Sequence, residues 1–134
     1  MQQQINKHMK EKKLLTRVET QVMNILWGLS DEGVTSAEMM KHYPEPKPAM
    51  TTLLTFLKRL TEKGFVRTEK QGKLLRFKPL IGRDEYTEQY LDDTKDTFFC
   101  GSPASLVSFF VRRQQFSDDE VNELLDIIKE KRQL

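Results

Sequence analysis

The chain has 134 residues and a formal net charge of +2, enough for one or two compact domains of ordinary size. It has no apolar run of the roughly 18 to 20 residues that a membrane helix needs, and Met1-Gln2-Gln3-Gln4 lacks the apolar core of a signal peptide, so we expect a cytoplasmic protein. Its single cysteine, Cys100, cannot form an internal disulfide or a thiolate metal site, and we expect a buried, inert thiol.

Three helices are predicted in the first half of the chain. Residues 1–13 are polar and basic and are expected to form a flexible arm. Capping-box patterns then begin two helices, one at Thr16 and a short one at Thr35. A third helix is expected from about Pro48, a proline suited to the first helical position, to Lys63.

A hairpin is predicted to follow the third helix. After Gly64 the apolar period changes from 3.6 towards 2, which indicates strands at residues 65–70 and 73–78 around a Gln71-Gly72 turn. Three helices followed by a hairpin are the element order of a winged helix-turn-helix domain. We assign this domain to residues 14–82 and predict a mainly α chain with a β-hairpin wing.

Residues 83–134 are predicted to be helical and to form a dimerisation domain. The last helix carries an apolar stripe that needs a partner surface, and so short a region cannot easily bury its apolar side chains within one copy. A symmetric homodimer satisfies this need, and packing onto the chain's own N-terminal domain is the alternative. The candidate dimerisation residues are Tyr90, Phe98, Leu106, Phe109, Phe110, Val121, Leu124, Leu125 and Ile128.

Charge divides between the two halves of the chain. Residues 1–83 hold 16 Lys and Arg against 8 Asp and Glu, whereas residues 84–134 hold 6 against 12. A basic half suits a polyanion such as DNA, because neutralised phosphates release condensed counterions. The charge division therefore favours a double-stranded DNA partner for the N-terminal half, and a solvated basic face without a partner is the alternative.

The third helix and the hairpin supply the candidate DNA contacts. On the helix, short polar side chains suit base edges and phosphate oxygens, cations suit the backbone, and an exposed leucine suits a thymine methyl. The hairpin carries cations around its turn, in the place for a phosphate or minor-groove contact. The candidate residues are Lys47, Thr51, Thr52, Leu54, Thr55, Lys58 and Arg59, with Arg67, Lys70, Lys73 and Arg76 on the hairpin.

Besides a DNA-binding repressor, the sequence has two alternative interpretations, a protein-binding module and an enzyme. Exposed Met50 and Leu54 on the third helix also fit a winged helix that binds only protein. An enzyme is disfavoured, because His8 and His42 are the only histidines and no glycine-rich phosphate loop or nucleophile elbow is present. We predict no catalytic residue, cofactor, metal or small-molecule ligand.

From Leu15 to about Ile128 the chain resembles the penicillinase repressor family, bacterial regulators of β-lactamase and methicillin-resistance genes. The matching stretches occur in the same order along the chain. They are Leu15-Thr16-Arg17-Val18-Glu19, Ile25-Leu26-Trp27, Val34-Thr35-Ser36-Ala37-Glu38, Thr51 to Gly64, Pro79 to Tyr86 and Ser105-Leu106-Val107. The resemblance implies a homodimeric repressor on inverted-repeat operators, released when a membrane-bound sensor protease signals antibiotic and the dimerisation region is cleaved.

The chain departs from the family pattern at three places. Leu54 stands where family members tend to carry a cation, so the resemblance does not give the operator sequence. The bond cut in relatives joins Asn and Phe, and the matching pair here is Phe109-Phe110, which we mark as the candidate cleavage region. A copper-responsive branch uses a C-terminal cysteine cluster, which Cys100 alone cannot supply.

Overall fold

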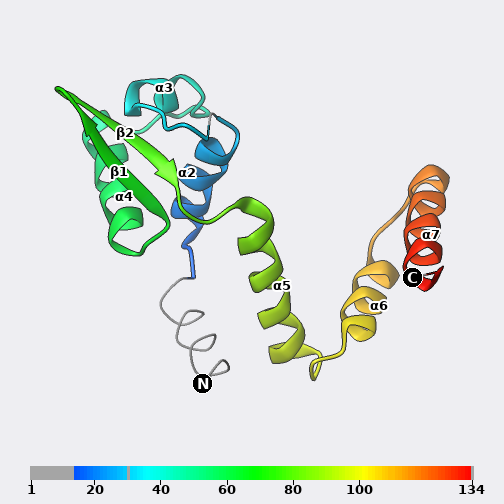
Figure 1. Cartoon of the computed structure of the whole chain (residues 1–134). Coiled ribbons are helices and arrows are strands. Elements are labelled where there is room, and N and C mark those ends of the chain that lie inside the picture. The colour runs from blue at the N-terminus through cyan, green and yellow to red at the C-terminus, as the bar shows by residue number, and fades with distance from the viewer. Residues whose placement is uncertain (1–13, 30, 134) are drawn as a thin grey trace. The chain divides into compact units, whose positions relative to one another are not determined.

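The computed structural model describes residues 14–29 and 31–133, so the predicted arm of residues 1–13 lies outside the described part of the chain. It confirms the predicted fold class, a mainly helical chain: among the described residues, three helices precede an antiparallel hairpin and further helices follow (Figure 1). The described elements are α2 (Arg17–Trp27), α3 (Ser36–Lys41), α4 (Met50–Glu62), β1 (Val66–Gln71), β2 (Leu74–Pro79), α5 (Arg83–Phe98), α6 (Pro103–Arg113) and α7 (Asp118–Gln133).

Side-chain caps begin α2 and α3 where the sequence predicted them. The Glu19 amide donates to Thr16 Oγ1 at 3.2 Å, and the Thr16 amide donates to Glu19 Oε1 at 2.9 Å, which completes a capping box. The Glu38 amide donates to Thr35 Oγ1 at 3.2 Å. The expected start of α4 was wrong: Ala49 is the N-cap, with an extended backbone, so Pro48 lies outside the helix.

The hairpin is shifted by one residue from its predicted register. Gln71 pairs with Leu74, so the turn consists of Gly72 and Lys73 and not of Gln71 and Gly72. Gly72 has φ of 61°, a left-handed conformation that glycine adopts without a steric penalty, and it takes the first turn position. We call the β1–β2 hairpin the wing.

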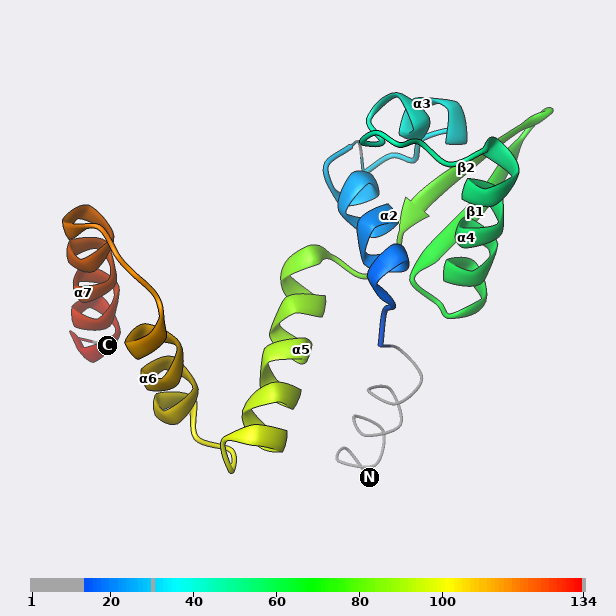
Figure 2. The ribbon, with the colours of Figure 1, turned by 180° about the vertical axis from the view of Figure 1, so that it is seen from behind.

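The core of the winged helix lies among α2, α3, α4 and the wing. Strand β1 packs on α4 and β2 packs on α2, and the opposed views of Figures 1 and 2 show the wing along one side of α4. Val34, before α3, exchanges backbone hydrogen bonds of 3.0 and 2.8 Å with Phe77 of β2. The fully buried side chains are Val22, Met23, Leu26, Met39, Leu53, Leu57, Leu60, Phe65 and Val66.

The first turns of α5 pack onto this core through Tyr86. The Tyr86 ring lies 6.2 Å from Trp27 and 5.7 Å from Phe65, centroid to centroid, and its hydroxyl accepts the Leu15 amide at 3.0 Å. Trp27 Nε1 donates to the Ile81 carbonyl at 2.8 Å, which fixes the connection between β2 and α5. These contacts hold the beginning of α5 against the winged helix.

The chain divides into two compact units, Met1–Asp93 and Thr94–Leu134. The boundary between these units falls inside α5. In the second unit, Ser102 and Ser117 cap α6 and α7 by accepting the amides of Ser105 and Glu120, each at 3.1 Å. No helix in the described part of the chain is both long and apolar enough to cross a bilayer.

Cys100 lies in the turn between α5 and α6, where it is exposed and has φ of 51°. The expectation of a buried thiol was therefore wrong. The reason is that no described residue from Thr94 to Gln133 is buried, so this part of a single chain contains no interior that could hold it.

Candidate nucleic-acid interface

One face of α4 is buried in the core and the other is open to solvent. Leu53, Leu57 and Leu60 are fully buried, which fixes the rotation of the helix about its axis. We call the exposed side the recognition face. Its members, all predicted from the sequence as DNA contacts, are Thr51, Thr52, Leu54, Thr55, Lys58 and Arg59.

The three threonines of the recognition face differ in what they offer a ligand. Thr55 Oγ1 donates to the Thr51 carbonyl at 3.0 Å, so its hydroxyl presents mainly acceptor lone pairs outward. Within the described part of the chain, the Thr51 and Thr52 hydroxyls are not used in hydrogen bonds and can donate or accept. Both kinds of group are needed to read base edges in a major groove.

The start of α4 also faces solvent. Thr16, Thr35 and Ser102 cap α2, α3 and α6 through side chains, but Ala49 at the start of α4 has no side chain that can accept a hydrogen bond. The Thr52 amide donates to the Ala49 carbonyl at 3.0 Å, but the amides of Met50 and Thr51 are left for an outside acceptor, and a phosphate oxygen suits them. Lys47, also predicted as a DNA contact, is exposed two residues earlier.

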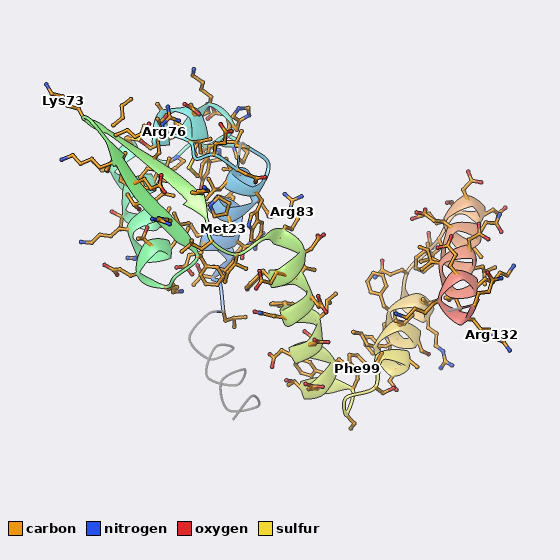
Figure 3. The ribbon with its side chains drawn as sticks, viewed as in Figure 1. Met23, Lys73, Arg76, Arg83, Phe99 and Arg132 are labelled. Carbon is orange, nitrogen blue, oxygen red and sulfur yellow. The ribbon has the colours of Figure 1, made fainter. Side chains whose placement is uncertain are left out.

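The four wing cations predicted as DNA contacts fall into two pairs. Lys70 and Lys73 are exposed, and Figure 3 shows Lys73 at the tip, pointing away from the body of the winged helix. Arg67 Nε instead lies 3.3 Å from Glu69 Oε1. Arg76 is half-buried and turned inward, so of these four cations Lys70 and Lys73 present exposed charge towards the tip.

Arg76 joins the wing to the loop before α3. Its Nε donates to Gln71 Oε1 at 2.8 Å, and its Nη1 donates to the Gly33 carbonyl at 3.2 Å. Sequence reasoning grouped Arg76 with the tip cations and did not find this contact, because no local pattern indicates which arginine bonds to a distant loop. The geometry makes Arg76 a brace that sets the angle of the wing.

A second brace ties α4 to α2, and sequence reasoning missed it as well. Lys63 Nζ lies 2.6 Å from Glu19 Oε1, and the Glu19 side chain is almost fully buried. Burial raises the pKa of Glu19, but the hydrogen bonds from Lys63 and from the Thr16 amide, with the Lys63 charge, outweigh it and hold the pKa below its ordinary value. The Glu19 capping role was visible in the sequence, whereas its Lys63 partner was not.

Comparison with known proteins gives concordant matches over most of the chain. The sequence model of the family described as penicillinase repressor matches residues 15–130. A penicillinase repressor of Bacillus licheniformis is 28% identical over 123 residues, which cover 91% of this chain and 94% of that protein. The methicillin resistance regulatory protein MecI of Staphylococcus aureus (strain N315) is 27% identical over 121 residues, which cover 87% and 94%.

Among solved structures, the DNA-binding domain of the repressor BlaI is similar to part of this chain. The match has 26% sequence identity and a TM-score of 0.47, and it covers 54% of this chain and 87% of that domain.

Proposed function

Because this chain belongs to the penicillinase repressor family, we propose that it represses transcription by binding operator DNA as a homodimer. Membership in a family of repressors also agrees with the expectation that the chain is not an enzyme. The observation that carries the proposal is the recognition face of α4, which is exposed, rich in threonine and cations, and flanked by a basic wing. A protein with this role acts in the cytoplasm, where bacterial DNA lies.

In the proposed complex, α4 enters the major groove. Thr51, Thr52 and Leu54 lie near the start of the helix, where side chains reach base edges, and Leu54 suits a thymine methyl. Thr55 adds an acceptor one turn further on. Lys58 and Arg59, towards the end of the helix, hold phosphates, and Lys47 and the first-turn amides of α4 hold others.

The wing supplies a second contact in this proposal. Lys70 and Lys73 bind a flanking phosphate or the minor groove, with Arg67 at the base of the same hairpin. Arg76 acts through the wing's position, because its guanidinium already bonds to Gln71 and Gly33.

Dimerisation is proposed for the second unit. Its helices expose large apolar side chains that a second copy would cover, and a two-fold dimer would present two reading helices to an inverted repeat. Tyr90 lies in the first unit and packs on Tyr86, so we place it outside the contact. The proposed contact residues are Phe98, Leu106, Phe109, Phe110, Val121, Leu124, Leu125 and Ile128.

Release by a membrane-bound sensor protease is proposed from family membership. Phe109 and Phe110 lie within α6 and are 47% and 55% exposed. The bond between them is accessible to a protease once α6 unwinds locally. A cut there separates α7 from the winged helix and so ends dimerisation.

Titration of the full chain against its own upstream DNA, at several salt concentrations, tests DNA binding. Lys58→Ala should weaken binding to every duplex and reduce the log-log salt slope by about 0.9, the value for one phosphate. Thr51→Ala should instead change the preference among sequences. Lys129→Ala on α7 removes one cation outside the proposed interface and serves as the control.

A second candidate function rests on Met50 and Leu54, which are each 38% exposed on α4. Such a surface fits a winged helix that binds protein and no DNA. A flat salt response, or equal affinity for operator and random duplex, would reject the repressor and favour this alternative.

A further inference from the structure

A groove runs between α2 and the first turns of α5, and α4 contributes no described residue to its lining. Its volume is about 460 Å³, and every residue that lines it belongs to the first unit. Sites for small organic molecules usually measure about 300–1,000 Å³. Figures 1 and 2 show from opposite sides that α5 begins beside α2. The groove therefore has the size of a small-molecule site and is separate from the recognition face.

Three aromatic rings form one wall of the groove. The Trp27 and Tyr86 ring centroids are 6.2 Å apart, and Tyr90 continues the row a further 6.2 Å from Tyr86. Tyr90 and Leu91, at the end of this row, are 51% and 48% exposed, although their side chains gain from burial. A flat aromatic molecule would cover this apolar surface and make offset or edge contacts with the rings.

The acidic residues at the start of α5 lie outside the groove lining. The lining residues of α5 occupy positions i, i+3, i+4, i+7 and i+8 of one helical face, and they are Arg83, Tyr86, Thr87, Tyr90 and Leu91. Asp84, Glu85 and Glu88 fall between these positions, and none of them lines the groove. Among the described residues, the lining holds two cations, Arg17 and Arg83, and no carboxylate. An occupant of the groove should therefore carry negative charge.

The two arginines of the groove are available to pair with an anion. Within the described part of the chain, neither guanidinium forms an ion pair with a carboxylate. Arg83 Cζ lies 5.9 Å from the centroid of the Trp27 ring, so its charge is next to the aromatic wall. Asn24, about one helical turn before Trp27, also lines the groove, and its exposed side-chain amide can donate a hydrogen bond there. Arginine offers a planar fork that matches a carboxylate through two parallel hydrogen bonds.

We propose that this groove binds a small aromatic carboxylate. The ring of the ligand lies along Trp27, Tyr86 and Tyr90. Its carboxylate pairs with Arg83, and Arg17 adds a second positive charge to the same groove. Such a ligand buries apolar area and supplies a partner for an unpaired cation at the same time. We predicted no small-molecule ligand from the sequence, because the two helix faces that form the groove are far apart along the chain.

Trp27 is the chain's only tryptophan and lines the groove, so the single indole N–H peak in a proton–nitrogen correlation spectrum reports on ligand binding there. In the full chain, 2-naphthoate should shift this peak to saturation, with an affinity about 10-fold or more above that of uncharged 2-naphthalenemethanol, because only the carboxylate pairs with Arg83. Acetate, which has no ring, should cause no shift at the same concentrations. Equal affinities for the two naphthalene compounds, or the lack of a saturable shift, would overturn the proposal.

Two variants separate the charge contact from the ring contact. Arg83→Gln should weaken 2-naphthoate about 10-fold and leave the alcohol unchanged, whereas Lys129→Gln, which removes a cation outside the groove, should keep the preference for the carboxylate. Tyr90→Ala should weaken both compounds alike, since it removes part of the ring surface. A preference that survives Arg83→Gln would contradict the proposal. An indole peak that moves with protein concentration alone would mean that a second copy, and not a small ligand, fills the groove. Thermal unfolding confirms that each variant folds.

Discussion

The two units of this chain use apolar side chains in opposite ways. In the first, α2, α4 and the wing enclose a set of fully buried residues, from Val22 to Val66 along the chain. In the second, α6 and α7 are amphipathic, yet no described residue from Thr94 to Gln133 is buried. A single copy therefore contains all that the winged helix needs to fold, whereas the second unit has an apolar surface whose burial requires something outside it.

The largest expected effect comes from opening the core of the first unit. Leu57→Ala should lower the free energy of unfolding by about 2–5 kcal/mol, the range for a fully buried leucine, because it leaves a cavity between α4 and its neighbours. Denaturant unfolding followed by circular dichroism measures this loss. The loss should be the same at every protein concentration; a loss that depends on concentration would mean that the first unit also relies on a second copy.

Charge introduced into the second unit should affect assembly and leave the winged helix intact. Leu125→Asp places a carboxylate in the proposed dimer contact, and sedimentation at micromolar concentration should show monomers where the original chain shows dimers. Operator affinity should fall by about 10²-fold or more, because two linked half-sites are lost. Glu123→Asp keeps the charge of a neighbouring exposed site and is the control. A Leu125→Asp chain that stayed dimeric would place the contact elsewhere.

The Glu19–Lys63 brace should give the first unit a characteristic response to pH. The pKa of Glu19 is lowered on folding, so the brace contributes stability above the ordinary value of 4.5, and this contribution is lost as pH falls through the lowered pKa. Lys63→Met removes the partner of a buried carboxylate and should cost about 1–3 kcal/mol near neutral pH. Without Lys63 only the Thr16 hydrogen bonds oppose the effect of burial, so the pKa of Glu19 is lowered less, and the variant should lose less stability than the original chain on acidification. Urea midpoints from pH 7 to 3 measure both changes, and parallel curves would refute the brace.

The smallest expected effects separate the two kinds of wing cation. Lys73→Ala should reduce the log-log salt slope of DNA binding by about 0.9, because it removes one phosphate contact. Arg76→Ala should weaken binding with little change in slope, since it frees the wing from Gly33 and Gln71. Equal slopes for the two variants, both reduced, would make Arg76 a direct phosphate contact.

Local signals in the sequence predicted most of the element boundaries. Four helices begin at a capping residue whose side chain accepts an amide three residues later: Thr16, Thr35, Ser102 and Ser117. Both partners of each hydrogen bond lie within the local sequence, so the sequence pattern alone is enough to locate these helix starts. The start of α4 was harder to place, because Ala49 has no capping side chain. The wing turn was misplaced by one residue for a similar reason: Gly72 suits either turn position, and cross-strand pairing decides between them.

Features that depend on distant partners could not be predicted in the same way. On α2, Val18 precedes the buried Val22 by four residues, a spacing typical of one apolar face, yet Val18 is 41% exposed. Met23 is fully buried instead, because packing against α4 and β2 selects the buried face. The recognition face of α4 was predicted residue by residue, since helical period separates it from Leu53 and Leu57. The inward turn of Arg76 required the loop at Gly33, which lies 43 residues away in sequence.

The core side chains that the winged helix buries all precede α5, and Tyr86 in the second turn of that helix is the last aromatic ring to pack on them. A chain cut at any point after α5 would therefore keep a folded winged helix with its recognition face. In the proposed dimer, such a chain would lose the second copy, and with it the affinity gained when two half-sites are bound together. Refolding does not restore a cleaved peptide bond, so the proposed repression could resume only after new protein is synthesised.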